Sequence, residues 1–68
     1  MKIGIVGLGL MGGSFALDIK IPYPNSVIYG LDMSKENLNK ALELGLIDHQ
    51  LEYSKISEMD LVLVAVPV

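Results

Sequence analysis

The chain has 68 residues, 51% of them hydrophobic, and a net charge of −3 from eight acidic residues against five lysines. This length excludes a two-domain enzyme within these residues, and without a basic stripe we expect neither nucleic acid nor an anionic membrane as a partner. Because there is no cysteine and only one histidine, His49, no disulfide or metal site is predicted. A mean hydropathy of +0.50 is high for so small a domain, and it predicts that these residues are part of a larger protein whose other residues cover their apolar faces.

An uncharged run over residues 3–17 has the length of the apolar region of a secretory signal peptide. It contains five glycines, which make a poor helix, and no small-residue cleavage site follows it. The run is also too short to cross a bilayer. We therefore expect a cytoplasmic protein, and the lack of cysteine is consistent with that compartment.

A strand and a helix are predicted in the first twenty residues. Residues 2–6 (KIGIV) form a short apolar run, which is typical of a strand buried on both faces of a parallel sheet. A helix is predicted over residues 11–20, where Phe15, Ala16 and Ile19 share one face. Two prolines shortly after it prevent the helix from continuing.

A second strand and helix follow in the middle of the chain. Residues 27–32 (VIYGLD) are rich in β-branched and aromatic side chains, as strands are. Ser34 is placed to cap a helix over residues 35–44, and Gly45 is placed to end it. The predicted buried stripe of this helix consists of Leu38, Ala41 and Leu42.

The last third predicts a weak edge strand near residues 50–52, a connector over 54–60 and a strongly apolar strand over 61–66. Alternating strands and helices indicate an α/β fold with right-handed crossovers. We therefore predict an incomplete Rossmann-type, doubly wound parallel sheet (β-α-β-α-β-β, strand order 3-2-1-4), truncated after the fourth strand. Residues 1–68 would then be the N-terminal part of a dinucleotide-binding domain, whose remainder lies outside this chain.

The glycine motif G-x-G-x-x-G occupies residues 7–12, directly after the predicted strand and at the start of the predicted helix. Gly7 permits the tight turn, Gly9 lets backbone approach a pyrophosphate, and Gly12 lets the helix pack closely on the sheet. The phosphates would accept hydrogen bonds from backbone N–H groups around Leu10 and Met11. The alternative is a glycine turn that serves only close packing.

Asp32 ends the second strand, 20 residues after Gly12. A carboxylate at this position can accept hydrogen bonds from both ribose hydroxyls of adenosine. Its charge would repel a 2′-phosphate, and the chain has no arginine to receive one. The residues therefore favour NAD over NADP as the cofactor. The alternative is a purely local role, in which Asp32 forms an Asx turn with Met33 and Ser34.

The end of the fourth strand supplies further candidates for the cofactor groove. In the strand order 3-2-1-4 this end faces the crevice where dinucleotides lie, so Ala65, Val66 and Pro67 can line it. Plain termination of the strand explains these residues equally well. His49 is expected on the surface, and no nucleophile or base in the chain has a partner, so no catalytic residue is predicted.

Four blocks of the sequence resemble prephenate dehydrogenases, including their arogenate-using relatives. They are residues 2–14 (KIGIVGLGLMGGS), 29–32 (YGLD), 41–48 (ALELGLID) and 60–68 (DLVLVAVPV). The glycine pair and serine that close the first block, the GLID step and the final AVPV are the specific features. β-Hydroxyacid dehydrogenases share the G-L-G-x-M-G part and less of the rest.

The resemblance implies oxidative decarboxylation of prephenate to 4-hydroxyphenylpyruvate, with hydride transfer to NAD, in tyrosine biosynthesis. In that family the substrate-binding histidines and arginine lie beyond the fourth strand, and a helical C-terminal domain forms the homodimer. The 68 residues alone are therefore expected to be inactive. The resemblance carries over only cofactor residues: Gly7, Gly9, Gly12 and Asp32, with Val66 and Pro67.

Two other functions are compatible with the same residues. A regulatory module that senses a nucleotide could use this fold without catalysis, since fold does not determine function. A dehydrogenase of another substrate class, of the β-hydroxyacid type, would use the same glycine motif. The sequence that follows Val68 would discriminate among the three.

Overall fold

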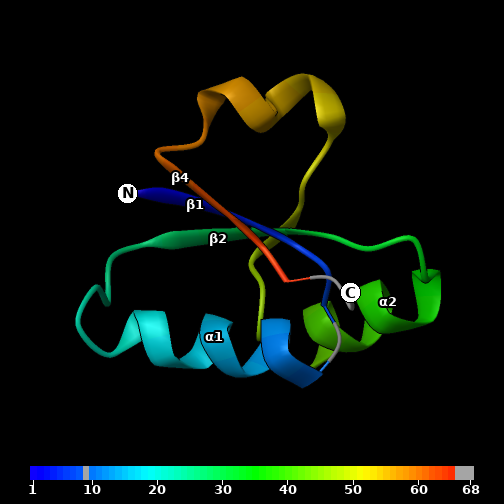
Figure 1. Ribbon diagram of the computed structural model, residues 1–68. Helices are drawn as coiled ribbons and strands as arrows, with labels where there is room; N and C mark the ends of the chain where they lie inside the picture. Colours follow the sequence, from blue (N-terminus) through cyan, green and yellow to red (C-terminus); the bar gives the residue numbers. More distant parts are fainter. Residues whose placement is uncertain (9, 66–68) are drawn as a thin grey trace.

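A four-stranded parallel sheet organises the chain in the computed structural model, which describes residues 1–8 and 10–65, with backbone alone for residues 10–14 (Figure 1). The strands lie in the order β3-β2-β1-β4, which confirms the predicted order 3-2-1-4. Their bounds are β1 (Lys2–Val6), β2 (Val27–Leu31), β3 (His49–Gln50) and β4 (Leu61–Val64).

The helices lie on both faces of this sheet. Helices α1 (Leu10–Lys20) and α2 (Lys35–Glu43) cover one face, and the 3₁₀ helix η1 (Tyr53–Glu58) lies over the other (Figure 1). Crossovers of one hand explain the division, because the chain steps outward from β1 to β3 and then returns across the sheet to β4. Neither α-helix has the length and apolar character of a membrane-spanning segment within the part of the chain described.

The predicted bounds differ from the structure mainly in the last third of the chain. The edge strand predicted near residues 50–52 is the two-residue β3, because the backbone pairs with β2 only at His49 and Gln50. The connector predicted over 54–60 contains η1. The strand predicted over 61–66 ends at Val64, and Val66 lies outside the described residues.

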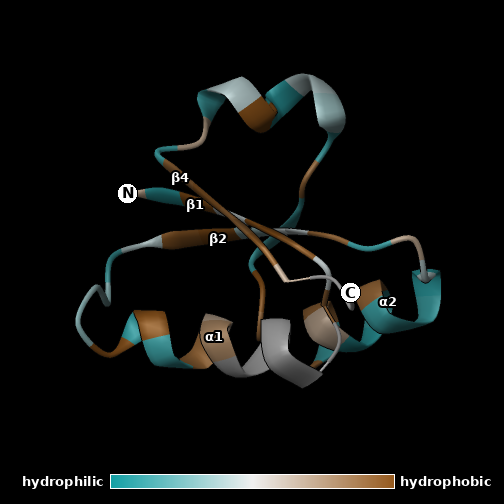
Figure 2. Cartoon of the chain, in the orientation of Figure 1, coloured by the Kyte–Doolittle hydropathy of each residue, from teal (hydrophilic) through white to brown (hydrophobic). Residues whose placement is uncertain are grey.

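The main core lies between the sheet and the two α-helices. Ile3, Ile5 and Ile28 are fully buried there, since alternate residues of a strand point to the same face. Strand β4 and the first part of β2 are coloured hydrophobic, whereas β1 begins with a hydrophilic residue and much of α2 is hydrophilic (Figure 2). From α1, Ala16 is buried and Phe15 and Ile19 pack against the core, as predicted; the cluster is completed by Leu8, Leu38, Ala41 and Ile47.

Leu42 departs from the predicted buried stripe of α2, because 38% of it is exposed. Leu38 and Ala41 face the sheet and are both buried. Successive helical residues are rotated by about 100°, so Leu42 falls at the flank of a stripe centred between the other two. The short helix therefore buries two residues of the predicted three.

Both ends of α2 are formed as the sequence predicts. The Ser34 hydroxyl accepts the N–H of Asn37 at 3.3 Å, which caps the first turn. At the other end Gly45 has a φ of +73°, and its N–H donates to the Leu42 carbonyl. Leu46 N–H reaches back to the Ala41 carbonyl at 2.9 Å, so the helix ends in a Schellman motif.

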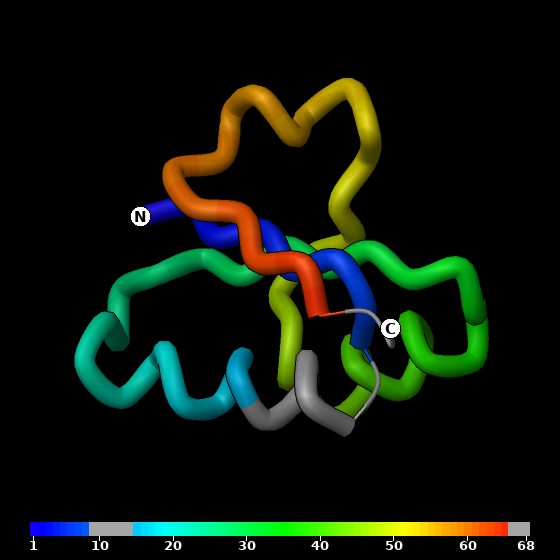
Figure 3. The backbone as a smooth tube through the Cα atoms, in the orientation of Figure 1, coloured from blue at the N-terminus to red at the C-terminus, as the bar shows by residue number. Residues whose placement is uncertain are grey.

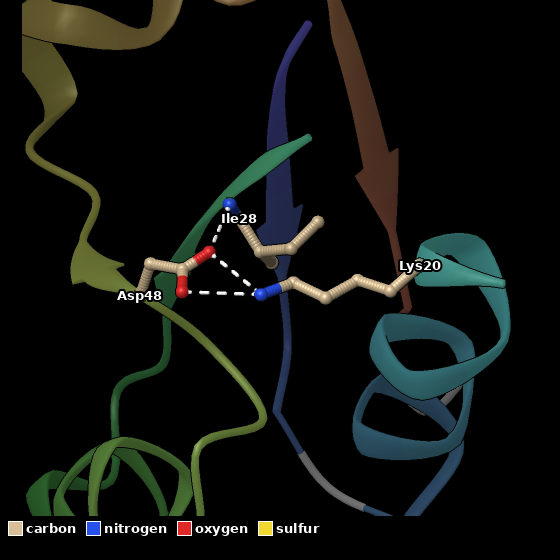
Figure 4. A network of polar contacts seen from close by, with 3 residues as sticks. All are labelled: Lys20, Ile28 and Asp48. Atoms are coloured by element: carbon tan, nitrogen blue, oxygen red, sulfur yellow. Dashed lines mark hydrogen bonds and ion pairs between the residues drawn. The ribbon is translucent and has the colours of Figure 1, made fainter. Parts of the chain in front are cut away.

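Two aspartates complete the amino-terminal edge of the sheet. The Asp48 carboxylate accepts the N–H of Ile28 at 2.8 Å and pairs with the Lys20 ammonium at 3.1 Å, while its own N–H donates to the Ile28 carbonyl (Figure 4). Asp60 repeats the arrangement on Lys2, whose N–H it accepts at 2.6 Å. Ile28 and Lys2 each come one residue before the first pair that their strand makes with β3 or β4. The carboxylate thus gives a backbone N–H at the start of the strand a hydrogen-bond partner.

Partial burial acts to raise the pKa of Asp48, but the Ile28 N–H and the Lys20 ammonium outweigh it, so the pKa of this carboxyl is lowered. The ionised form is therefore the one that holds α1 to the entry of β2. The sequence pattern did not predict that Asp48 or Asp60 would bind a strand N–H.

Strand β4 leaves apolar surface open. It runs beside β1 (Figure 3), with Ile3 to Val6 paired to Leu61 to Val64. The strands described supply no partner for its other edge. Leu61, Val62 and Val64 are 43%, 38% and 63% exposed. An open apolar edge of this kind is the arrangement that natural sheets avoid.

We expect the isolated 68-residue chain to associate through β4 at micromolar concentration. Burial of these side chains returns several kcal/mol at about 25 cal/mol per Å² of apolar area, comparable to the stability of a small domain. Sedimentation measures the outcome, and Val64→Lys is the matched variant, because a charge at an exposed edge position opposes strand pairing. A folded monomer for the unsubstituted chain would contradict the prediction.

Candidate nucleotide site

The glycine turn begins where β1 ends, at the carboxyl edge of the sheet. Gly7 has a φ of +97°, a conformation that side chains with a Cβ rarely adopt. Its N–H donates to the Leu31 carbonyl at 2.7 Å, just past the last β1–β2 pair, Val6 with Leu31. Gly7 therefore continues the ladder by one hydrogen bond and then turns the chain away from the sheet toward α1.

Leu8 fastens this turn to the core. Only 6% of the residue is exposed, although it lies in a loop. Its side chain occupies the space left by the missing side chain of Gly30, where a Cβ would lie 2.9 Å from Leu8 Cδ1 and 2.8 Å from Ile47 Cδ1. Gly30 is thus required for close packing of the turn on β2, a role that the glycine motif alone does not predict.

Asp32 bridges the turn and the start of α2. Its Oδ2 accepts the N–H of Leu8 at 2.7 Å, and its Oδ1 accepts the N–H of Ser34 at 2.8 Å. The second bond is the Asx turn predicted as the local alternative, and the first is a contact across 24 residues of sequence. The carboxylate therefore stabilises the local turn before α2 and also binds the backbone of the distant glycine turn.

The electrostatics of Asp32 favour its ionised form. The N–H groups of Ser34 and Leu8 lower the pKa of this carboxyl, with a smaller contribution from the Asn37 amide, and they outweigh partial burial, which acts in the opposite direction. An ionised carboxylate has about four acceptor positions. Within the part of the structure described, the Leu8 and Ser34 N–H groups each use one position, and the Asn37 amide competes for another, so room remains for a further donor such as a ribose hydroxyl.

The remaining motif residues lie at the start of α1 or outside the description. Helix α1 begins at Leu10, so the backbone of Leu10, Met11 and Gly12 forms its first turn, where unpaired N–H groups attract anions. Gly9 lies outside the described residues, as do Val66 and Pro67.

Two other residues singled out from the sequence, Ala65 and His49, make no hydrogen bond with Asp32 among the residues described; Ala65 lies at the end of β4. Ala65 N–H donates to the Val6 carbonyl at 2.7 Å, so β4 ends beside the start of the glycine turn. His49 is exposed, as predicted, and its ring centre lies 5.2 Å from that of Tyr29. Among residues 1–8 and 10–65, no three histidine or acidic side chains gather closely enough to hold a metal ion.

Known proteins match this chain over nearly its whole length. The family described as prephenate dehydrogenase, nucleotide-binding domain, matches residues 15–68. The prephenate dehydrogenase of Bacillus subtilis (strain 168) is 44% identical over 66 residues, which are 94% of this chain and 18% of that protein. That of Lactococcus lactis subsp. cremoris (strain MG1363) is 44% identical over 68 residues, 98% of this chain and 19% of that protein.

A solved structure has the same fold. The crystal structure of prephenate dehydrogenase from A. aeolicus in complex with hydroxyphenyl propionate and NAD+ matches with a TM-score of 0.84 at 36% identity. The match covers 98% of this chain and 24% of that one. The chain thus spans less than a fifth of the length of the two curated relatives.

Replacement of Asp32 by asparagine should make the free energy of unfolding less dependent on pH in the acidic range. The pKa of the Asp32 carboxyl is lowered from its ordinary value of 3.8, so its ionised form stabilises the fold above that pH. This contribution is lost as the pH falls through the lowered value. Urea unfolding in the Val64→Lys background, which opposes association, should therefore show the chain with Asp32 more stable than Asp32→Asn by roughly 1 kcal/mol from pH 5 to 7, with the difference shrinking below about pH 4. A difference that stays constant down to pH 2 would refute this assignment.

Proposed function

The chain belongs to the family of prephenate dehydrogenase nucleotide-binding domains, and from this premise we propose that it binds NAD at the glycine turn and Asp32. It would do so as the N-terminal part of a dehydrogenase that oxidatively decarboxylates prephenate. The observation that carries the proposal is the Asp32 carboxylate, held by the Leu8 and Ser34 N–H groups at the carboxyl end of β2. Ligands of open α/β sheets bind at these strand ends.

Asp32 would bind the adenosine ribose and select the cofactor. The acceptor room that remains on its carboxylate is open to a ribose hydroxyl of NAD. A 2′-phosphate at the same place would meet the carboxylate charge, and the pKa of Asp32 is lowered, so that charge persists at neutral pH. The relative from A. aeolicus was crystallised with NAD+, which supports the same choice.

The pyrophosphate would lie against the first turn of α1. Its N–H groups and the helix dipole favour a negative charge there. We propose that Gly7, Gly9 and Gly12 allow this close approach, and that backbone N–H groups of Leu10 and Met11 donate to the phosphates. Val66 and Pro67 remain proposed parts of the groove wall.

The chain's own contribution would be binding and orientation. NAD supplies the acceptor for the hydride when it is bound. The residues that hold prephenate, and the surface that forms a homodimer, would belong to the part of the protein beyond these residues. The relatives from Bacillus subtilis, Lactococcus lactis and A. aeolicus are prephenate dehydrogenases, which favours this substrate over those of the β-hydroxyacid type.

Asp32→Ala in the protein that carries this chain should weaken NAD binding by roughly 1–3 kcal/mol, the range for hydrogen bonds to a charged group. NADP should lose far less or even gain, because the repulsion of its 2′-phosphate disappears with the carboxylate. Titration calorimetry with both cofactors measures the two changes. Equal losses for NAD and NADP would exclude Asp32 as the ribose ligand.

Asp48→Ala is the matched control for that experiment. It also removes a carboxylate that accepts a backbone N–H, that of Ile28, but at the amino-terminal edge of the sheet. It should lower stability and leave the ratio of NAD to NADP affinity unchanged.

The 68-residue chain alone should produce no NADH from NAD and prephenate. Binding the cofactor by itself supplies neither substrate orientation nor an acid or base at the reacting carbon. Absorbance at the NADH band measures turnover, with a complete prephenate dehydrogenase as the positive control. Activity in a preparation free of longer protein would place the catalytic groups within these residues.

A further inference from the structure

We propose that Asp32 is also a positioning residue, whose carboxylate holds the glycine turn in its nucleotide-binding shape by accepting the Leu8 N–H. The inference rests on the proposed function and adds a second task to the same side chain. On this view, affinity for any dinucleotide depends on a hydrogen-bond acceptor at position 32, separately from the negative charge that selects NAD.

The Leu8 N–H has need of this acceptor. The β1–β2 ladder delivers its last bond to Gly7, whose N–H donates to Leu31, and the chain then leaves the sheet. Leu8 is nevertheless almost completely buried, so its N–H has little access to water. A buried N–H without a partner is costly. Asp32 Oδ2 supplies the partner at 2.7 Å.

Leu8 is held at two points, and this is why its position matters. Its side chain packs into the space above Gly30 and against Ile47, and its N–H is bound to Asp32. Packing alone resists withdrawal of the side chain from the core, whereas the hydrogen bond fixes the direction of the backbone. Leu8 stands two residues before Leu10, the first residue of α1, so a fixed Leu8 narrows the range of positions open to the start of the helix.

The Asp32 carboxylate is itself held in place by the backbone at the start of α2. Its Oδ1 accepts the Ser34 N–H at 2.8 Å, and the Ser34 hydroxyl caps α2 through Asn37. The glycine turn, the end of β2 and the start of α2 are therefore joined through one carboxyl group. Because both oxygens are fixed by backbone, the acceptor positions that remain are aimed before a ribose arrives.

Asparagine and alanine at position 32 separate the two tasks. Both remove the charge, but asparagine keeps one acceptor oxygen. That oxygen can accept the Leu8 N–H in place of Oδ2, and the Ser34 N–H, which then faces the amide NH₂ group, must find another acceptor. If Asp32 serves only the ribose, asparagine can still accept the 3′-hydroxyl of NADP, but the Leu8 amide should be equally protected from exchange in the two variants. If it also positions the turn, Asp32→Ala should bind NADP roughly 2- to 10-fold more weakly than Asp32→Asn, the range of one neutral hydrogen bond.

A readout without nucleotide tests the turn directly. In the protein that carries this chain, labelled with ¹⁵N-leucine, hydrogen exchange of the Leu8 amide should be at least about tenfold faster in Asp32→Ala than in the unsubstituted protein. The Leu51 amide, which donates to the Gly30 carbonyl at 2.7 Å and belongs to a fully buried residue, serves as the internal control for general loss of stability. In Asp32→Asn the Leu8 amide should remain protected.

The outcomes distinguish the two proposals. Fast exchange at Leu8 with the expected NADP ranking supports the positioning role. Unchanged exchange at Leu8 in Asp32→Ala, or equal NADP affinity in the two variants, overturns it even if the unsubstituted protein binds NAD. If that protein does not bind NAD while Leu8 still depends on Asp32, the proposed function fails and the anchoring of the turn stands.

Discussion

The hydrogen bond from Leu8 N–H to the Asp32 carboxylate joins the ends of two neighbouring strands, and the candidate site depends on it. It exists because β1 and β2 are parallel and adjacent, which brings their carboxyl ends to the same edge. A glycine turn and an acidic strand end, 24 residues apart, become one structure there. Without the hydrogen bond from Leu8, Asp32 would form only its local Asx turn with Ser34.

Three aspartates perform the same backbone chemistry at different places in the sheet. Asp48 and Asp60 accept N–H groups at the amino-terminal edge, where strands begin, and Asp32 accepts them at the carboxyl edge. Only the carboxyl edge also holds the turn into α1, where helix N–H groups attract anions. The three carboxylates make alike contacts with backbone, so what distinguishes the one proposed to bind the ribose is its position at the carboxyl edge.

The high apolar content of the chain is explained by the strands of the sheet, some of which are buried and one of which is partly exposed. One face of β1 and β2 is sealed by α1 and α2, with Ile3, Ile5 and Ile28 fully buried. Strand β4 carries the same kind of residues, yet Val64 is 63% exposed. In the relatives, this chain corresponds to less than a fifth of the length. The mean hydropathy of +0.50 thus reflects apolar side chains that these residues bury only in part.

The sequence by itself determined what depends on near neighbours: the order of strands and helices, the Ser34 cap, the Gly45 stop and the glycine motif. Each of these follows from periodicity or from contacts within a few residues, which a linear pattern records. Tertiary structure alone decided that Gly30 makes room for Leu8, and that Asp48 and Asp60 hold strand ends. These contacts join residues 20 to 58 positions apart, and they arise only when the sheet brings distant segments together.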